Sequence, residues 1–147
     1  MPGGERGRAL DSAVRALARR DHSTASLGAK LERAGVSEAA RNDALAELAE
    51  AGYLDDARFA GERARILAGR GYGNDLIRAD LETNGVPTEA VEAAVALLEP
   101  ERERALRQAG ALGGGLRAAT KLQRRGFSEE TLEELCAGPL RTTQPQQ

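Results

Sequence analysis

An internal repeat with a spacing of 50 residues constrains the fold more than any other feature of this sequence. When residues 10–48 are set against residues 60–98, leucine, glycine and basic positions coincide without a gap, and a weaker third copy follows 41 residues later. Short repeated units cannot bury an apolar face alone, so they must stack on their neighbours in an elongated array. The coinciding positions include Leu17 and Leu67, Arg20 and Arg70, Leu31, Leu81 and Leu122, and Gly35, Gly85 and Gly126.

Each copy has the pattern of three short helices. Leucines and alanines recur at helical spacing, Ser23 and Ser37 stand where N-caps are needed, and Gly35 follows the second helix as a C-terminal stop. The first helix is predicted to start near Leu10. Strands are disfavoured because the chain is rich in Ala, Leu, Arg and Glu, with aromatic residues at only 3%.

We therefore predict an all-α fold of three tandem three-helix repeats that form an elongated, curved array. The repeats span residues 10–54, 55–99 and 100–138, and the third is degraded by a glycine-rich turn. Residues 1–9 and 139–147 are rich in Gly, Pro or Gln without apolar periodicity, and both ends are expected to be disordered.

The stretch "GYLDDARFA" lies at the junction of the first two repeats and contains two adjacent carboxylates, Asp55 and Asp56. On a helix their side chains diverge by about 100°, so they cannot form the facing pair that acid–base catalysis needs. Aspartate at a helix start instead accepts backbone N–H bonds. We expect a helix cap here, with Tyr53 and Phe59 packing the two repeats together.

Other candidate sites have structural interpretations. "GRGYG" at 69–73 follows a predicted helix rather than a strand, so it is read as an interhelical turn and not a phosphate loop. His22, the only histidine, is expected at a half-exposed turn, and Cys136, the only cysteine, shares a repeat column with Leu45 and Val95 and is expected to be buried. No catalytic residues, metal site or cofactor are predicted.

The net charge is only −2, but the charge is banded along the chain. Between residues 104 and 127 six basic residues occur with no acidic one, and Arg117, Lys121, Arg124 and Arg125 fall within about 100° of one helix face. A solvated surface normally intersperses carboxylates, so this stripe points to an anionic partner. A weaker cluster comprises Arg19, Arg20, Lys30 and Arg33.

The blocks "ALARRDHSTASLGAKLERAGV", "GYLDDARFAGERARILAGRGYGNDLIRADLETNGV" and "KLQRRGFSEETLEEL" resemble the RecX family of proteins that regulate the RecA recombinase. The resemblance covers about residues 10–137. It implies tandem three-helix repeats that lodge in the groove of a RecA filament, contact its protomers and nearby single- or double-stranded DNA, and limit filament growth, ATP hydrolysis and strand exchange.

The leading hypothesis is thus a non-enzymatic, monomeric modulator of RecA; the absence of any signal-like or membrane-spanning run makes a cytoplasmic location the expectation. A helical DNA-binding protein acting alone and a helical adaptor for an unrelated protein are the alternatives. The residues expected to face the partner are Arg19, Arg20, Arg65, Arg70, Arg78, Lys121, Arg124 and Arg125.

Overall fold

A computed structural model describes residues 2–137, which form nine α-helices and no strand. The all-α prediction is confirmed. None of these helices has both the length and the apolar character needed to cross a membrane. The helices are α1 Pro2–Arg19, α2 Thr24–Arg33, α3 Glu38–Glu50, α4 Asp56–Gly69, α5 Asn74–Thr83, α6 Thr88–Ala96, α7 Glu101–Ala111, α8 Gly115–Arg124 and α9 Glu129–Ala137.

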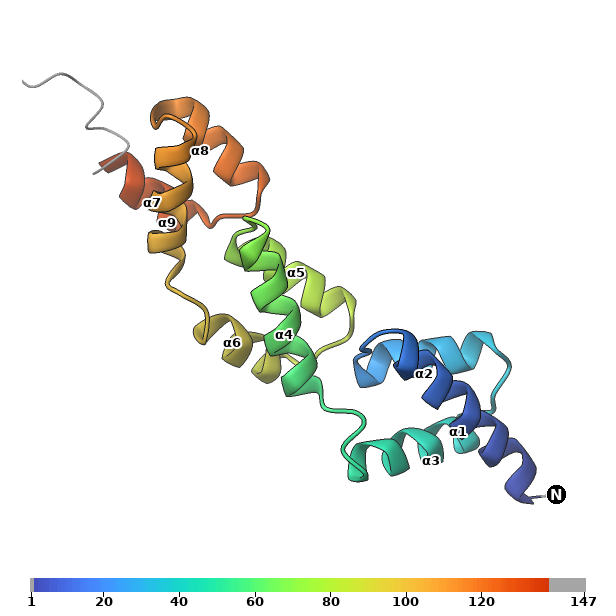
Figure 1. Cartoon of the computed structure of the whole chain (residues 1–147). Helices are drawn as coiled ribbons and strands as arrows, with labels where there is room; N and C mark the ends of the chain where they lie inside the picture. Colours follow the sequence, from blue (N-terminus) through green and yellow to red (C-terminus); the bar gives the residue numbers. More distant parts are fainter. Residues whose placement is uncertain (1, 138–147) are drawn as a thin grey trace, which may run out of the picture.

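The helices pack in threes into unit 1 (α1–α3), unit 2 (α4–α6) and unit 3 (α7–α9), and the most extensive helix pairings all lie within a unit. Each unit has its own hydrophobic cluster, built on apolar residues four positions apart that share one helix face. Leu27 and Leu31 in unit 1 and Ile77 and Leu81 in unit 2 are almost completely buried. Among residues 2–137, no buried cluster extends from one unit into the next, so each unit has a separate small core. The three units follow one another along the array (Figure 1).

The second helix of every unit ends in the same turn. Gly35, Gly85 and Gly126 have φ of 85°, 73° and 87°, a left-handed conformation that glycine adopts at little cost. The following residue then donates its backbone N–H to a carbonyl five positions back, for example Val86 to Leu81 at 3.1 Å. At the other end, Ser23 caps α2 by accepting from the Ser26 N–H.

The N-terminal residues depart from the predicted disorder. Helix α1 begins at Pro2 rather than near Leu10, so the disordered segment predicted over 1–9 is wrong where the structure describes it. Two contacts to α3 hold this extension, since Glu5 accepts from the Ser37 N–H at 2.9 Å and Arg6 pairs with Glu47 at 2.9 Å. Ala9 is completely buried. The predicted disorder over 139–147 lies outside the described residues.

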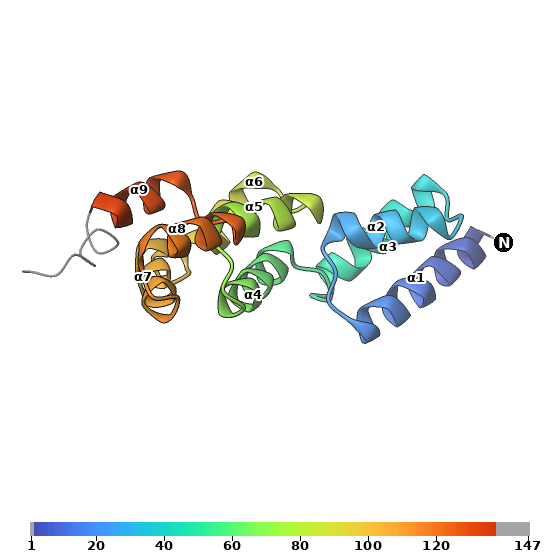
Figure 2. The same cartoon turned by 90° about the horizontal axis from the view of Figure 1, so that it is seen from above.

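The three units form an elongated array in which equivalent helices follow one another. The second helices α2, α5 and α8 run along one long side and the third helices α3, α6 and α9 along the opposite side (Figure 1). The first helices α1, α4 and α7 form a third side (Figure 2). The molecule therefore presents long surfaces, each composed of one type of helix.

Successive units meet at a joint in which the start of one second helix rests on the glycine turn of the next. A Cβ added to Gly85 would lie 2.3 Å from the Cβ of Ala25, and one added to Gly126 would lie 2.3 Å from the Cβ of Leu76. Real Cβ atoms do not approach so closely, so only glycine permits these contacts. The equivalent Gly35 in unit 1 has open space around it.

This difference predicts that Gly85→Ala and Gly126→Ala destabilise the protein more than Gly35→Ala. All three variants incur left-handed backbone strain of about 1–2 kcal/mol. Gly85→Ala and Gly126→Ala add a steric overlap worth about 1–3 kcal/mol more. Chemical denaturation of the three variants measures the difference, and equal losses would show that the joints are not closely packed.

Candidate binding surfaces and inter-unit joints

A hollow on unit 1 gathers three basic side chains with no carboxylate. It is lined by Ser12, Arg15 and Ala16 from α1, by Arg19 at the end of that helix, and by Lys30 from α2. Positions 15 and 19 are one helical turn apart and so share a face. We call this group the unit 1 hollow.

A second hollow of the same kind lies on α8 of unit 3. Its lining consists of Leu116, Arg117, Thr120, Lys121 and Arg124, which recur at the helical spacings of three and four. Leu116 is 82% exposed, so an apolar side chain stands among three cations at this site. We call this group the α8 hollow.

The six cations of the two hollows form no ion pair with any described residue. Six other arginines of the described chain are already paired with carboxylates; Arg63, for example, binds both oxygens of Asp80 at 2.7 Å. Cations without a neighbouring carboxylate keep their full attraction for an anion. The two hollows are thus the surfaces best suited to phosphate or to an acidic protein.

The structure divides seven of the eight predicted partner-facing residues into three groups. Arg19, Lys121 and Arg124 belong to the hollows. Arg20 lines a different hollow between units 1 and 2, and Arg70 is exposed at the end of α4. Two others are engaged in ion pairs on unit 2, since Arg65 lies 3.7 Å from Glu62, and Arg78 contacts Glu92 at 3.0 Å and Asp75 at 3.6 Å.

Arg125 does not belong to the basic stripe in which the sequence placed it. It forms the C-cap of α8, and its guanidinium donates to Gln108 of α7, in the same unit, at 2.6 Å. Arg15, Lys30 and Arg117 also line the hollows but are not among the predicted partner-facing residues, and the sequence places Lys30 and Arg117 only in its basic clusters. The spacing of four between Arg15 and Arg19, and the proximity of α1 to α2, are the signals that identify the unit 1 hollow.

Three other expectations need correction. Tyr53 is 65% exposed and does not pack the units together, because Leu54 takes the inward position beside the unit 1 core, whereas Phe59 is buried in the core of unit 2. Cys136 is exposed because Leu135 occupies the inward position of α9. His22 is buried rather than half-exposed.

The first joint, between units 1 and 2, rests on few polar contacts. Asp55 caps its own helix by accepting from the Arg58 N–H at 3.1 Å, while Asp56 reaches back and accepts from the Thr24 N–H at 2.7 Å. The Ser23 hydroxyl donates to the Asn84 carbonyl. The adjacent aspartates therefore begin two different helices, one in each unit.

His22 lies at this joint with half of its ring unsatisfied. The Ser26 hydroxyl donates to the Ser23 carbonyl at 3.1 Å, so it accepts from His22 Nδ1 at 3.2 Å, and Nε2 is left as an acceptor. Nε2 is buried and has no hydrogen-bond partner among the described residues. A buried polar atom left in this way costs about 1–3 kcal/mol.

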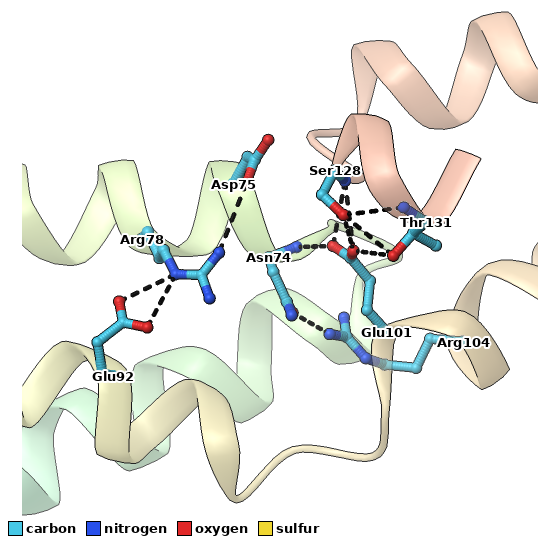
Figure 3. Close-up of polar contacts among 8 residues, drawn as sticks. All are labelled: Asn74, Asp75, Arg78, Glu92, Glu101, Arg104, Ser128 and Thr131. Atoms are coloured by element: carbon cyan, nitrogen blue, oxygen red, sulfur yellow. Dashed lines mark hydrogen bonds and ion pairs between the residues drawn. The ribbon is translucent and has the colours of Figure 1, made fainter. Parts of the chain in front are cut away.

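The second joint, between units 2 and 3, is centred on a buried carboxylate (Figure 3). Glu101, the first residue of α7, accepts from the Asn74 N–H at 2.6 Å and from the hydroxyls of Ser128 and Thr131 at 2.5 Å each. The Ser128 N–H adds longer contacts at 3.3 Å. Burial raises the pKa of Glu101, but these hydrogen bonds outweigh it and hold the pKa below 4.5.

Further contacts tie units 2 and 3 together. The Arg104 guanidinium, 5% exposed, donates to the Tyr72 carbonyl at 3.0 Å and to the Asn74 side chain. Two backbone bonds cross the joint, from Gly73 N–H to the Arg125 carbonyl at 2.8 Å and from Asp75 N–H to the Gly126 carbonyl at 2.9 Å. Gln108 also donates to the Gly71 carbonyl at 3.1 Å. The second joint is therefore bonded through both backbone and side chains.

Comparison with known proteins gives one consistent match. Two family models match the chain, "RecX, first three-helix domain" at residues 9–48 and "RecX, second three-helix domain" at 55–95. "Regulatory protein RecX" of Stenotrophomonas maltophilia is 38% identical over 133 residues, covering 84% of this chain and 82% of its own length. The protein of the same name from Xanthomonas axonopodis pv. citri is 36% identical over the same shares.

A solved structure supports the fold. The crystal structure of RecX from Lactobacillus salivarius superimposes with a TM-score of 0.79 at 16% identity, covering 92% of this chain and 96% of that one. At this identity the match establishes the fold alone. Within residues 2–137, His, Cys, Asp and Glu side chains do not form a group of three that could hold a metal ion.

His22 predicts a loss of stability in mildly acidic solution. Burial lowers the pKa of His22 below its ordinary 6.5, and the charges of Arg20 and Lys30 lower it further, while Asp21 opposes them. The unfolded chain then binds more protons than the folded one below pH 6.5. Above pH 6.5, neutral His22 makes its full contribution to the free energy of unfolding. This contribution is lost as the pH falls from 6.5 toward the pKa of His22 in the folded protein.

Thermal melts between about pH 7.5 and pH 5.5 should show the midpoint falling in the wild type and changing less in His22→Gln, which cannot titrate. Glu101 does not interfere, because its lowered pKa affects stability only below 4.5. Parallel curves for the two proteins would contradict the burial of the imidazole at the joint.

Proposed function

Because the chain belongs to the RecX family of regulatory proteins, which are not enzymes, we propose that it regulates the RecA recombinase by binding in the groove of the RecA–DNA filament. Bound there, it limits filament extension, ATP hydrolysis and strand exchange. The protein acts as a monomer in the cytoplasm.

The observation that carries this proposal is the pair of unpaired basic hollows at opposite ends of an elongated array. Separate cores in series provide extended surfaces rather than one deep pocket. Arg19 and Lys30 in unit 1, and Lys121 and Arg124 in unit 3, offer cations with no internal carboxylate partner in the described chain. Such surfaces fit a long anionic partner that is contacted at more than one point.

The hollows favour contact with phosphate, whereas Arg65 and Arg78 are better placed for contact with protein. Their guanidinium groups already pair with carboxylates on the surface of unit 2, and surface pairs of this kind exchange at little cost for other acidic groups. Arg20 and Arg70, at equivalent places in the repeat, remain candidates for either contact.

Addition of the protein at or below stoichiometric ratio should slow DNA-dependent ATP hydrolysis by the RecA protein of the same organism. The measurement is the steady-state rate on single-stranded DNA, with the protein added before and after filament assembly. If the protein limits filament extension, it should inhibit ATP hydrolysis more strongly when it is added before filament assembly than after it. An unchanged rate in both orders would overturn the proposal.

The α8 hollow can be tested with two variants of equal charge in the same unit. Lys121→Ala/Arg124→Ala removes unpaired cations, whereas Arg102→Ala/Arg107→Ala removes exposed arginines already paired with Glu134 and Glu99. Half-inhibition of ATP hydrolysis by RecA should require a concentration of the first variant about tenfold higher than of the wild type, equivalent to a loss of about 1.4 kcal/mol in binding free energy. The second should resemble the wild type, and equal losses would show that net charge alone matters.

The same two variants also test the alternative that the protein binds DNA alone, without acting on RecA. Binding to DNA without RecA should be measured over a range of salt concentrations, because each phosphate contact contributes about 0.9 to the logarithmic salt slope on duplex DNA. Tight, salt-dependent binding combined with no effect on RecA would support the alternative. Capture of an unrelated protein with neither activity would support an adaptor.

A further inference from the structure

The two joints occupy equivalent places in the repeat but have different chemistry. Residues that bridge units 2 and 3 can be compared with their counterparts between units 1 and 2 by counting from the first residue of α4 and of α7, which are Asp56 and Glu101. Both carboxylates accept from the N–H that begins the preceding second helix. Beyond that shared contact the two joints diverge.

The side chains that complete the second joint are missing from the first. Arg104 corresponds to Phe59, which is buried in the unit 2 core, and Gln108 corresponds to Arg63, which pairs with Asp80 inside its own unit. At the start of the third helix, 41 residues apart, Ser128 corresponds to Pro87, which has neither a hydroxyl nor an N–H to donate.

The second joint also has more hydrogen bonds to the backbone than the first. The second joint has the two backbone bonds from Gly73 and Asp75, whereas the first has a single hydroxyl contact, from Ser23 to the Asn84 carbonyl. The first joint also buries the unpartnered Nε2 of His22. No buried apolar cluster crosses either joint, and the docking of a helix start on a glycine turn is common to both. The polar contacts are therefore what distinguishes how firmly adjacent units are held at the two joints.

We propose that the first joint is a hinge: unit 1 swings as a body about residues 51–55, while units 2 and 3 move together as one rigid body. The joint with fewer bonds opens at lower free energy, as weakly bonded segments of folded proteins do. The unsatisfied imidazole lowers the cost of opening further, because water reaches Nε2 when the joint opens.

The hinge has a consequence for binding that does not depend on the identity of the partner. The unit 1 hollow lies on one side of the hinge and the α8 hollow on the other. Their separation is therefore adjustable, and one molecule can match contact points on an anionic partner whose spacing varies. A fixed first joint would restrict the protein to one spacing.

Distance distributions between pairs of spin labels test the hinge in the full chain. Labels at Ala46→Cys and Ala93→Cys, in a Cys136→Ser background, span the first joint. Labels at Ala93→Cys and the native Cys136 span the second. All three positions are exposed. The first distribution should be about twice as wide as the second, because domain hinges sample a broader range than rigid units.

Exchange of residues between the joints provides the matched controls. Asp56→Glu/Pro87→Ser/Ala90→Thr gives the first joint the carboxylate and hydroxyls of the second, and should narrow the first distribution. Glu101→Asp/Ser128→Pro gives the second joint the residues of the first, and should widen the second. Circular dichroism checks that each variant retains its helices.

The proposal would be overturned if the two distance distributions of the wild type were equally wide while Glu101→Asp/Ser128→Pro widened the distribution across the second joint. That widening would show that the measurement detects a loosened joint. A wider distribution across the second joint would overturn the proposal as well.

Discussion

The fold depends on the contact between the start of one second helix and the glycine turn that ends the next. At Gly85 and Gly126 the neighbouring side chain lies where a Cβ would be, so the turn is both a helix stop and a docking surface. The acidic residue that begins the next unit then accepts from the first backbone N–H of the docked helix, which has no partner within that helix. One short motif thus ends a helix, sets the direction of the array and provides a hydrogen-bond acceptor for a backbone N–H at the start of the docked helix.

The serial arrangement also explains how a chain with a net charge of −2 presents basic surfaces. The third helices contain four acidic residues in α3, two in α6 and four in α9, against the single basic residue Arg41. Because α3, α6 and α9 lie along one side of the array, many carboxylates are held away from the opposite side (Figure 1). The cations of α8 therefore remain unpaired, and the banded sequence becomes a segregated surface.

Features encoded by nearby residues could be predicted from the sequence. The helical class, the repeat and the caps at Ser23 and Asp55 depend on spacings of a few residues, and the same spacings recur in each copy. The N-terminal part of α1 was missed because its helix is stabilised by α3, more than 30 residues away. Asp56 was expected to cap a helix, but its partner, Thr24, belongs to the preceding unit.

The candidate site was predicted less completely, because a helical projection ignores how a helix ends. Arg125 falls within the angular range of the basic stripe, yet it stands at the C-cap, where the chain leaves the helix and the side chain turns to Gln108. The unit 1 hollow combines Arg15 and Arg19 of α1 with Lys30 of α2, and no pattern within one helix specifies that pairing. Tertiary packing decides which cations share a surface.

The difference between the joints bears on how two weak surfaces act together. Three exposed cations bind an anion weakly, but once one hollow is occupied the other binds at an effective concentration set by the connection between them. A rigid connection gives the highest effective concentration for one spacing and almost none for others. Pro87 and Phe59, which stand where the second joint has Ser128 and Arg104, release the first joint from that restriction. The repeat thus preserves the docking contact at both joints while its substitutions decide which of them can move.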